Sequence, residues 1–254
     1  MKSALFHVIV PFLICITLAN TSLFDRVKVD LTYDHYAEKV VDYFPFLIAM
    51  PFNSLINIAY MLMGLFWLLK YRDKNETKDE RYTREVFALM AIFYAPVQWW
   101  RLAVLQRAPA VLDQWFTLPI FAWVPIWINF IQDKTTKKYA FVAELCSILS
   151  YGLSLKFEWG FETALGCHVF LAIYKGTQVQ LRLGNHQTFT YLVLAMLSCA
   201  GFVVLKLLDH WLAQFWIFQR MTGHFWSKVC DVLQFHYSFC FLTTLTQITH
   251  KAKD

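Results

Sequence analysis

The last long apolar run of the sequence, Gly223 to Thr246, carries four polar side chains where a lipid-facing helix would carry none. They are Lys228, Asp231, Gln234 and His236. A histidine inside a membrane helix can serve as a metal ligand or as part of a proton relay. More often such a histidine is a hydrogen-bonded interior residue, and the sequence favours that interpretation here.

Helical geometry separates these four side chains. Asp231 and His236 are five residues apart, which turns them about 140° from each other around the helix axis. Lys228, Asp231 and Gln234 share one side, whereas His236 lies beside Val232 and Cys240. We therefore expect at least two separate polar environments along this helix.

Asp113 is the second candidate for chemistry, because it stands at the start of the apolar run Val111 to Ile131. It could act as a general base, or as a partner of metal-bound water, facing a cavity under His236. The structural alternative is a carboxylate that the helix dipole favours near an N-terminus.

Two lysine–aspartate pairs are spaced by three residues, Lys206 with Asp209 and Lys228 with Asp231. Such neighbours can neutralise each other on one helix. We predict that both are internal ion pairs near the luminal ends of their helices.

A stripe of polar and small residues marks the second apolar run, Phe44 to Lys70. Asn53, Asn57, Tyr60 and Gly64 follow one another at spacings of four, three and four, so they share one helix face. Amides in apolar sequence face other helices rather than lipid. The residues expected to line a polar cavity are Asn53, Ser54, Asn57, Tyr60, Asp113, Asp209, Asp231, Gln234 and His236.

Composition identifies a membrane protein. The 254 residues are 58% hydrophobic and 16% charged, whereas soluble domains carry roughly a quarter charged residues. The charges cluster between apolar runs of bilayer-spanning length. Lysine and arginine in cytoplasmic loops account for the net charge of +5, so no nucleic-acid partner is expected. None of the six cysteines forms a CxxC pair, which argues against a thiolate zinc site or a disulfide framework.

The order of apolar runs predicts an all-α fold. Residues 1–20 form a membrane helix or a signal peptide, 21–43 a luminal connector, 44–248 a seven-helix membrane bundle, and 249–254 a cytosolic tail. The charged stretch Tyr71 to Arg84 is predicted to be a cytoplasmic loop. The sixth apolar run, Gly160 to Lys175, is followed by a predicted short loop at residues 181–187.

Several long segments resemble the transmembrane protein 187 family over nearly the whole chain. They include AMPFNSLINIAY, AVLDQWFTLPIFAW, GFETALGCHV and TGHFWSKVCDVLQFH. The resemblance implies a multi-pass protein of internal membranes, in the Golgi or trans-Golgi network with the endoplasmic reticulum as the alternative, and it implies no particular activity.

A second similarity is to the alkaline ceramidases and the wider superfamily that includes the progestin and adipoQ receptors. It is carried by FNSLIN, by VLDQWFTLP, by LLD ending at Asp209 and by the helix with His236. It implies a seven-helix bundle with an intramembrane zinc site of three histidines, a serine and an aspartate. Asp113 and His236 match the aspartate and the last histidine.

Two departures weaken the zinc expectation. Val232 stands where the preceding histidine would be, and PVQWWRL has no serine or histidine. A catalytic zinc normally takes three protein ligands, which one histidine and one carboxylate do not supply. We therefore expect no cofactor, with zinc retained only if the site has been rebuilt.

Three functions follow from these patterns. The first is a non-enzymatic membrane protein that binds or handles a lipid in a polar-lined cavity with a degenerate metal-hydrolase-like site. The second is an intramembrane lipid amide hydrolase with an atypical site of Asp113, His236 and Asp209 or Asp231. The third is a membrane scaffold or sorting component whose polar residues only hold helices together.

Overall fold

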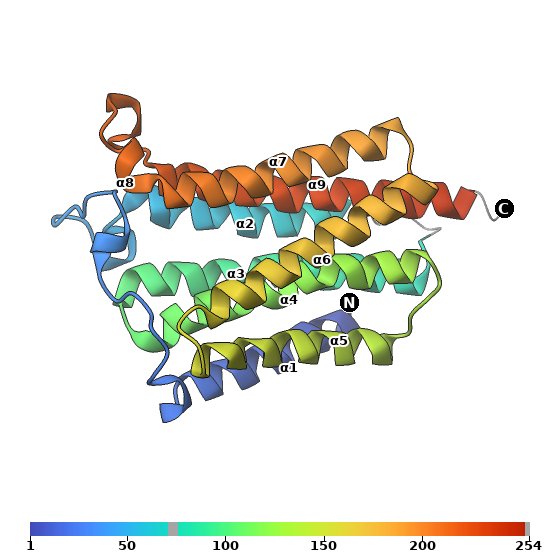
Figure 1. Cartoon of the computed structure of the whole chain (residues 1–254), viewed down its shortest axis with the longest axis horizontal. Coiled ribbons are helices and arrows are strands. Elements are labelled where there is room, and N and C mark those ends of the chain that lie inside the picture. Colours follow the sequence, from blue (N-terminus) through green and yellow to red (C-terminus); the bar gives the residue numbers. More distant parts are fainter. Residues whose placement is uncertain (71–75, 252–254) are drawn as a thin grey trace.

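A computed structural model describes residues 1–70 and 76–251, and all regular structure in these residues is helical (Figure 1). The elements are α1 (Lys2–Ala19), η1 (Ser22–Phe24), η2 (Tyr33–His35), η3 (Phe46–Ile48), α2 (Pro51–Lys70), α3 (Lys78–Val104), α4 (Arg107–Ile131), α5 (Lys137–Ser150), η4 (Tyr151–Leu155), α6 (Gly160–Leu183), α7 (His186–Leu207), α8 (Asp209–Leu212), η5 (Trp216–Phe218) and α9 (Gly223–Lys251).

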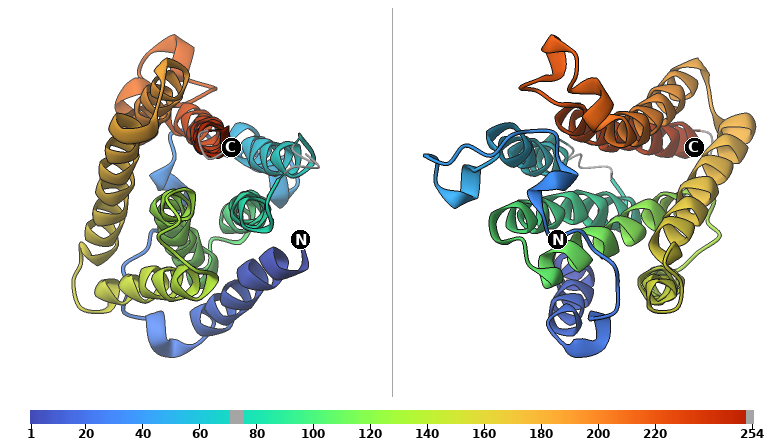
Figure 2. Two further views of the ribbon diagram at one scale, coloured as in Figure 1. Left: turned by 90° about the vertical axis from the view of Figure 1, so that its right-hand side faces the viewer. Right: turned by 60° about the vertical axis from the view of Figure 1, so that its left-hand side comes forward.

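The long helices run along the long axis of the molecule, and α4 lies among α1, α3, α5 and α6 (Figures 1 and 2). The most extensive helix pairs are α7 with α9 and α2 with α3. Gly64 permits the second of these, because a Cβ there would lie 2.7 Å from the carbonyl oxygen of Ala88. In the described residues, five helices are long and apolar enough to cross a membrane: α1, α2, α3, α4 and α7.

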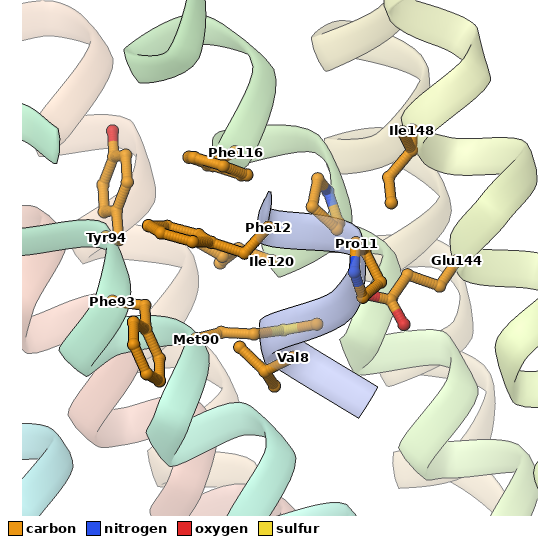
Figure 3. A pocket seen from close by; sticks show the side chains of 11 residues that line it. Val8, Pro11, Phe12, Met90, Phe93, Tyr94, Phe116, Ile120, Glu144 and Ile148 are labelled. Carbon is orange, nitrogen blue, oxygen red and sulfur yellow. The ribbon is translucent and has the colours of Figure 1, made fainter. Parts of the chain in front are cut away.

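The N-terminal helix α1 packs into the bundle against α3, α4 and α5. His7 is buried, with its Nδ1 atom 2.7 Å from the Tyr82 hydroxyl and its Nε2 atom in contact with the carboxylate of Glu144. Phe12 stacks on Phe116 at a centroid distance of 4.7 Å, beside a cavity of about 30 Å³ (Figure 3). Apolar and polar contacts therefore both anchor α1.

The connector between α1 and α2 covers one end of the bundle, called the connector end below (Figure 1). The buried Glu38 carboxylate accepts hydrogen bonds from the backbone N–H groups of Phe52 at 2.8 Å and Asn53 at 2.9 Å. These two N–H groups belong to the first turn of α2 and have no partner within the helix. Glu38 therefore caps that helix from fourteen residues away. The Tyr33 hydroxyl also donates to the Leu102 carbonyl at the end of α3.

The predicted loop from Tyr71 to Arg84 is too long. A capping box between Thr77 and Glu80 begins α3 at Lys78, so its last seven residues are helical. Arg84 is buried and donates to Glu76 at 2.7 and 2.8 Å. The first part of the predicted loop, residues 71–75, lies outside the described residues.

The predicted loop at residues 181–187 is also too long. Helix α6 continues to Leu183, and Asn185 caps α7, which begins at His186. At the C-terminus α9 extends to Lys251, so the first part of the predicted tail is helical. Residues 252–254 lie outside the described residues.

The buried contact between His7 and Glu144 predicts that α1 is part of the folded protein. His7→Phe should leave the Glu144 carboxylate without its histidine partner and lower the free energy of unfolding by about 3–5 kcal/mol. Thermal unfolding in detergent measures this loss. The double variant His7→Phe/Glu144→Leu should recover most of it, and equal losses in the single and double variants would contradict the role of this pair.

Candidate functional site

Buried and half-buried polar side chains from five helices meet near the connector end, and we call this group the polar cluster. Its members are Asn53, Asn57 and Tyr60 of α2, Tyr94, Gln98 and Arg101 of α3, Asp113 of α4, Lys206 of α7, and Lys228 and Asp231 of α9. The predicted stripe of α2 is confirmed, because Asn53, Asn57 and Tyr60 have no exposed surface.

An ion pair between Arg101 and Asp113 joins the end of α3 to the start of α4. The two helices are linked by a tight turn in which Leu105 has a φ of 42°, and this turn brings the two residues to the same depth. Both side chains are mostly buried, at 11% and 14% exposed. Asp113 is thus a partner of arginine rather than a free carboxylate at a helix start.

Asp231 is held by α2. The fully buried Tyr60 hydroxyl donates to its carboxylate at 2.7 Å, so the middle of α2 is joined to α9 through a hydrogen bond to a charged group. Tyr94 and Gln98 lie next to Asp113 and Tyr60, respectively.

The two predicted lysine–aspartate pairs are wrong. Within the described residues, no carboxylate lies within 4.0 Å of the ammonium of Lys206 or Lys228. Asp231 instead accepts from Tyr60, and Asp209 accepts from backbone amides. Both lysines interact electrostatically with Asp113, which places their ammonium groups in the polar cluster.

Asp209 organises the backbone at the connector end. Its carboxylate accepts from the backbone N–H of Ala37 at 2.8 Å and of His224 at 2.7 Å. The second bond satisfies a free donor in the first turn of α9, and the first fastens the connector to it. The close approach requires Gly223, where a Cβ would lie 3.0 Å from the Cα of Asp209.

His236 lies apart from the polar cluster. Its ring is 5.6 Å from the ring of Trp67, near the far end of α2, and its Nε2 atom is 3.6 Å from Cys240 Sγ. Along α9 it is about 7 Å further from the connector end than Asp231, at 1.5 Å per residue. The structure does not bring His236 to Asp113.

An apolar groove lies where α4, α6, α7 and α9 face one another. It encloses about 50 Å³ and is lined by Phe121, Val124, Val169, Ala172, Ile173, Gly176, Leu192, Ala195, Met196, Cys199, Gln234, Ser238 and Phe241. Gln234, which the sequence placed in a polar cavity, lies here, and its Oε1 atom is buried without a hydrogen-bond partner among the described residues.

The groove continues the faces of α7 and α9 that carry the polar cluster. On α9, Asp231, Gln234 and Ser238 follow at spacings of three and four. On α7, Lys206 and Cys199 are seven residues apart, which is close to two turns. The polar cluster and the groove therefore follow one another along this pair of helices, and we call this succession of a polar and an apolar surface the path.

The sequence analysis missed Arg101, Tyr94, Gln98 and His224. Arg101 was read only as part of the segment PVQWWRL, although a basic residue just before a short turn and an acidic residue just after it were a signal for an ion pair. His224 was not singled out, and it is buried against Tyr36 at a centroid distance of 4.5 Å.

Two titratable side chains of the connector, His35 and Tyr36, lie close to the polar cluster. Burial, followed by the nearby Lys206 and Arg101, lowers the pKa of His35 to about 4, while Asp30, 3.7 Å away, opposes this shift. Burial also raises the pKa of Tyr36 to about 12. Both groups are therefore neutral at neutral pH.

The grouping of possible metal ligands can be stated for the described residues. Among residues 1–70 and 76–251, no three or more His, Cys, Asp or Glu side chains are grouped so that they could hold a metal ion. In the polar cluster the carboxylate of Asp113 is occupied by Arg101, and that of Asp231 accepts from Tyr60.

Long apolar helices around a buried polar cluster define a helical integral membrane protein. The chain belongs to the TMEM187 protein family, whose model matches residues 4–243. It is 49% identical to transmembrane protein 187 of Bos taurus over 247 residues, covering 95% of this chain and 96% of the relative. It is 50% identical to transmembrane protein 187 of Homo sapiens over 241 residues, covering 94% and 91%. No solved structure gives a significant match.

The contacts of Asp209 predict a loss of stability when it is changed. Asp209→Leu removes the acceptor of two backbone hydrogen bonds and should cost about 3 kcal/mol or more, since hydrogen bonds to charged groups contribute about 1.5–3 kcal/mol each. Thermal unfolding in detergent gives the measurement. Asp209→Asn, which keeps one acceptor oxygen, should lose less. If Lys206→Leu destabilised as strongly as Asp209→Leu, a lysine–aspartate pair would explain the result better than capping.

The low pKa of His35 predicts that acid loosens the connector. An undocked connector, with a histidine pKa near 6.5, binds more protons than the docked one, so docking is most stable above about pH 6.5 and weakens as pH falls toward 4. Hydrogen exchange of residues 21–50, corrected for the intrinsic rate, should become faster at pH 5 than at pH 7.5 relative to the helices. His35→Asn should abolish this difference, and its persistence in that variant would assign the effect to another group.

Proposed function

We propose that this protein binds a membrane lipid, with the polar head at the polar cluster and part of one acyl chain in the apolar groove. The observation that carries the proposal is the continuity of one α9 face, from Lys228 and Asp231 to Gln234 and Ser238. A lipid has a polar head joined to an apolar chain, so its binding site needs a polar surface with an apolar surface next to it.

The depth of the polar cluster suits a lipid head. Lys228 and Asp231 stand about two turns inside α9, whereas the groove extends further from the connector end. A lipid of the leaflet at the connector end would thus direct its chain toward the middle of the bilayer. The groove is small, so the rest of the lipid would stay in the membrane beside α6 and α7.

Buried polar atoms support a ligand at the head position. The side chains of Asn53 and Gln98 lie beside the Glu38 carboxylate and the Tyr60 hydroxyl, respectively, but Asn53 Nδ2 and Gln98 Nε2 make no hydrogen bond within 3.5 Å among the described residues, although both residues are at most 4% exposed. Buried polar groups in native proteins are nearly always satisfied by protein, water or ligand. The polar cluster therefore has donors to offer to a head group.

The intramembrane hydrolase is not proposed. Its two main residues, Asp113 and His236, have different surroundings: Asp113 pairs with Arg101, and His236 packs on Trp67. The distant relationship to the alkaline ceramidases, the seven-helix arrangement and the location in the Golgi region stay predictions. A ligand-free scaffold is the alternative that the following experiment distinguishes.

Filling the groove should remove the lipid. Ala195 lines the groove and is 8% exposed, whereas Ala200, on the same helix, is exposed. Purified wild-type protein and Ala200→Trp should retain lipid through extensive washing with detergent, and Ala195→Trp should retain several-fold less, measured by mass spectrometry of extracted lipids. Equal retention in the two variants, or none in the wild type, would contradict the proposal and favour the scaffold.

A further inference from the structure

Lys228 is a buried cation that lacks an ion-pair partner. Its side chain is 7% exposed, and among the described residues no carboxylate lies within 4.0 Å of its ammonium and no hydrogen bond satisfies it. Buried charges in proteins are paired, or else bound to a ligand of opposite charge. Lys228 is therefore a candidate to bind an anion.

The surrounding carboxylates make their closest contacts with groups other than Lys228. Asp113 is bound by Arg101, and Asp231 accepts from Tyr60. Asp209 accepts from two backbone N–H groups at the start of α9 and in the connector. Glu38 likewise accepts from two N–H groups at the start of α2.

Lys206 adds a second ammonium to the same region. It interacts electrostatically with Asp113, Arg101 and Asp231, and within the described structure it also lacks a carboxylate within 4.0 Å. Lys228 interacts electrostatically with Glu38 as well as with Asp113 and Asp231. The two ammonium groups therefore lie in a region that holds several carboxylates, although among the described residues none is within 4.0 Å of either ammonium.

We propose that the polar cluster binds a lipid with an anionic phosphate head group, held by Lys228 and Lys206. This inference rests on the proposed lipid binding and specifies its ligand class. Lysine ammonium groups bind phosphate as point charges, and the amide donors of Asn53 and Gln98 can serve its remaining oxygens. An uncharged head group would give neither ammonium a close anionic contact, and among the described residues no carboxylate lies within 4.0 Å of either one.

The apolar groove next to the polar cluster is the reason for proposing a lipid rather than free phosphate. The apolar groove follows the polar cluster on both α7 and α9, and its lining includes Leu192, Met196 and Phe241. A free phosphate would use only the lysines, whereas a phospholipid would use the whole path. The two ligands share the chemistry of the head, so they must be compared directly.

The test measures thermal unfolding of the full chain in nanodiscs. The discs contain phosphatidylcholine alone, phosphatidylcholine with a minor fraction of phosphatidic acid, or phosphatidylcholine with inorganic phosphate in the buffer. The variants are Lys228→Met, Lys228→Arg and the control Lys39→Met, at an exposed lysine of the connector.

Phosphatidic acid should stabilise the wild type and Lys39→Met, and its apparent affinity should fall by about tenfold or more in Lys228→Met. Lys228→Arg should retain most of the effect. In phosphatidylcholine alone, Lys228→Met should be at least as stable as the wild type, because it removes a buried ammonium that has no partner.

Other outcomes overturn the inference in distinguishable ways. An equal response of wild type and Lys228→Met to phosphatidic acid, or unfolding of Lys228→Met in phosphatidylcholine alone, would show that Lys228 has a structural role. Retained lipid with no preference for phosphatidic acid would leave lipid binding intact and refute the anionic head. Full stabilisation by inorganic phosphate would keep the anion site and refute the lipid.

Discussion

The ion pair between Arg101 and Asp113 is the interaction on which the polar end of the bundle depends. It joins α3 to α4 immediately below their connecting turn, and the lysines of α7 and α9 face the same carboxylate. Charges inside a membrane protein are costly unless a partner compensates them. The arrangement of this end can therefore be understood by asking what satisfies each charge.

The carboxylates at this end have partners of three kinds. Asp113 takes a guanidinium, Asp231 takes a tyrosine hydroxyl, and Glu38 and Asp209 each take two backbone N–H groups at the start of a helix. The last two also fasten the connector, since Glu38 belongs to it and Asp209 binds the N–H of Ala37. The same two carboxylates thus cap the helices and hold the connector over this end of the bundle.

The sequence predicted which faces are buried better than it predicted which groups pair. The spacing of Asn53, Asn57 and Tyr60 located a buried face correctly, because periodicity reports the direction of side chains on one helix. The same reasoning paired Lys228 with Asp231, and that pair does not form, because Tyr60 of another helix bonds the carboxylate. Partners across helices depend on tertiary packing, which local spacing does not encode.

His236 and Lys228, both on α9, differ in how well their surroundings satisfy them. A histidine can bind metal, yet the ring of His236 packs on Trp67 and its nearest polar contact is Cys240. A neutral histidine in such a place needs nothing further. A buried lysine does, because its charge persists unless the proton is lost or an anion arrives. Among the described residues no carboxylate lies within 4.0 Å of the Lys228 ammonium, so on this helix Lys228, rather than His236, is the group whose charge lacks a close partner.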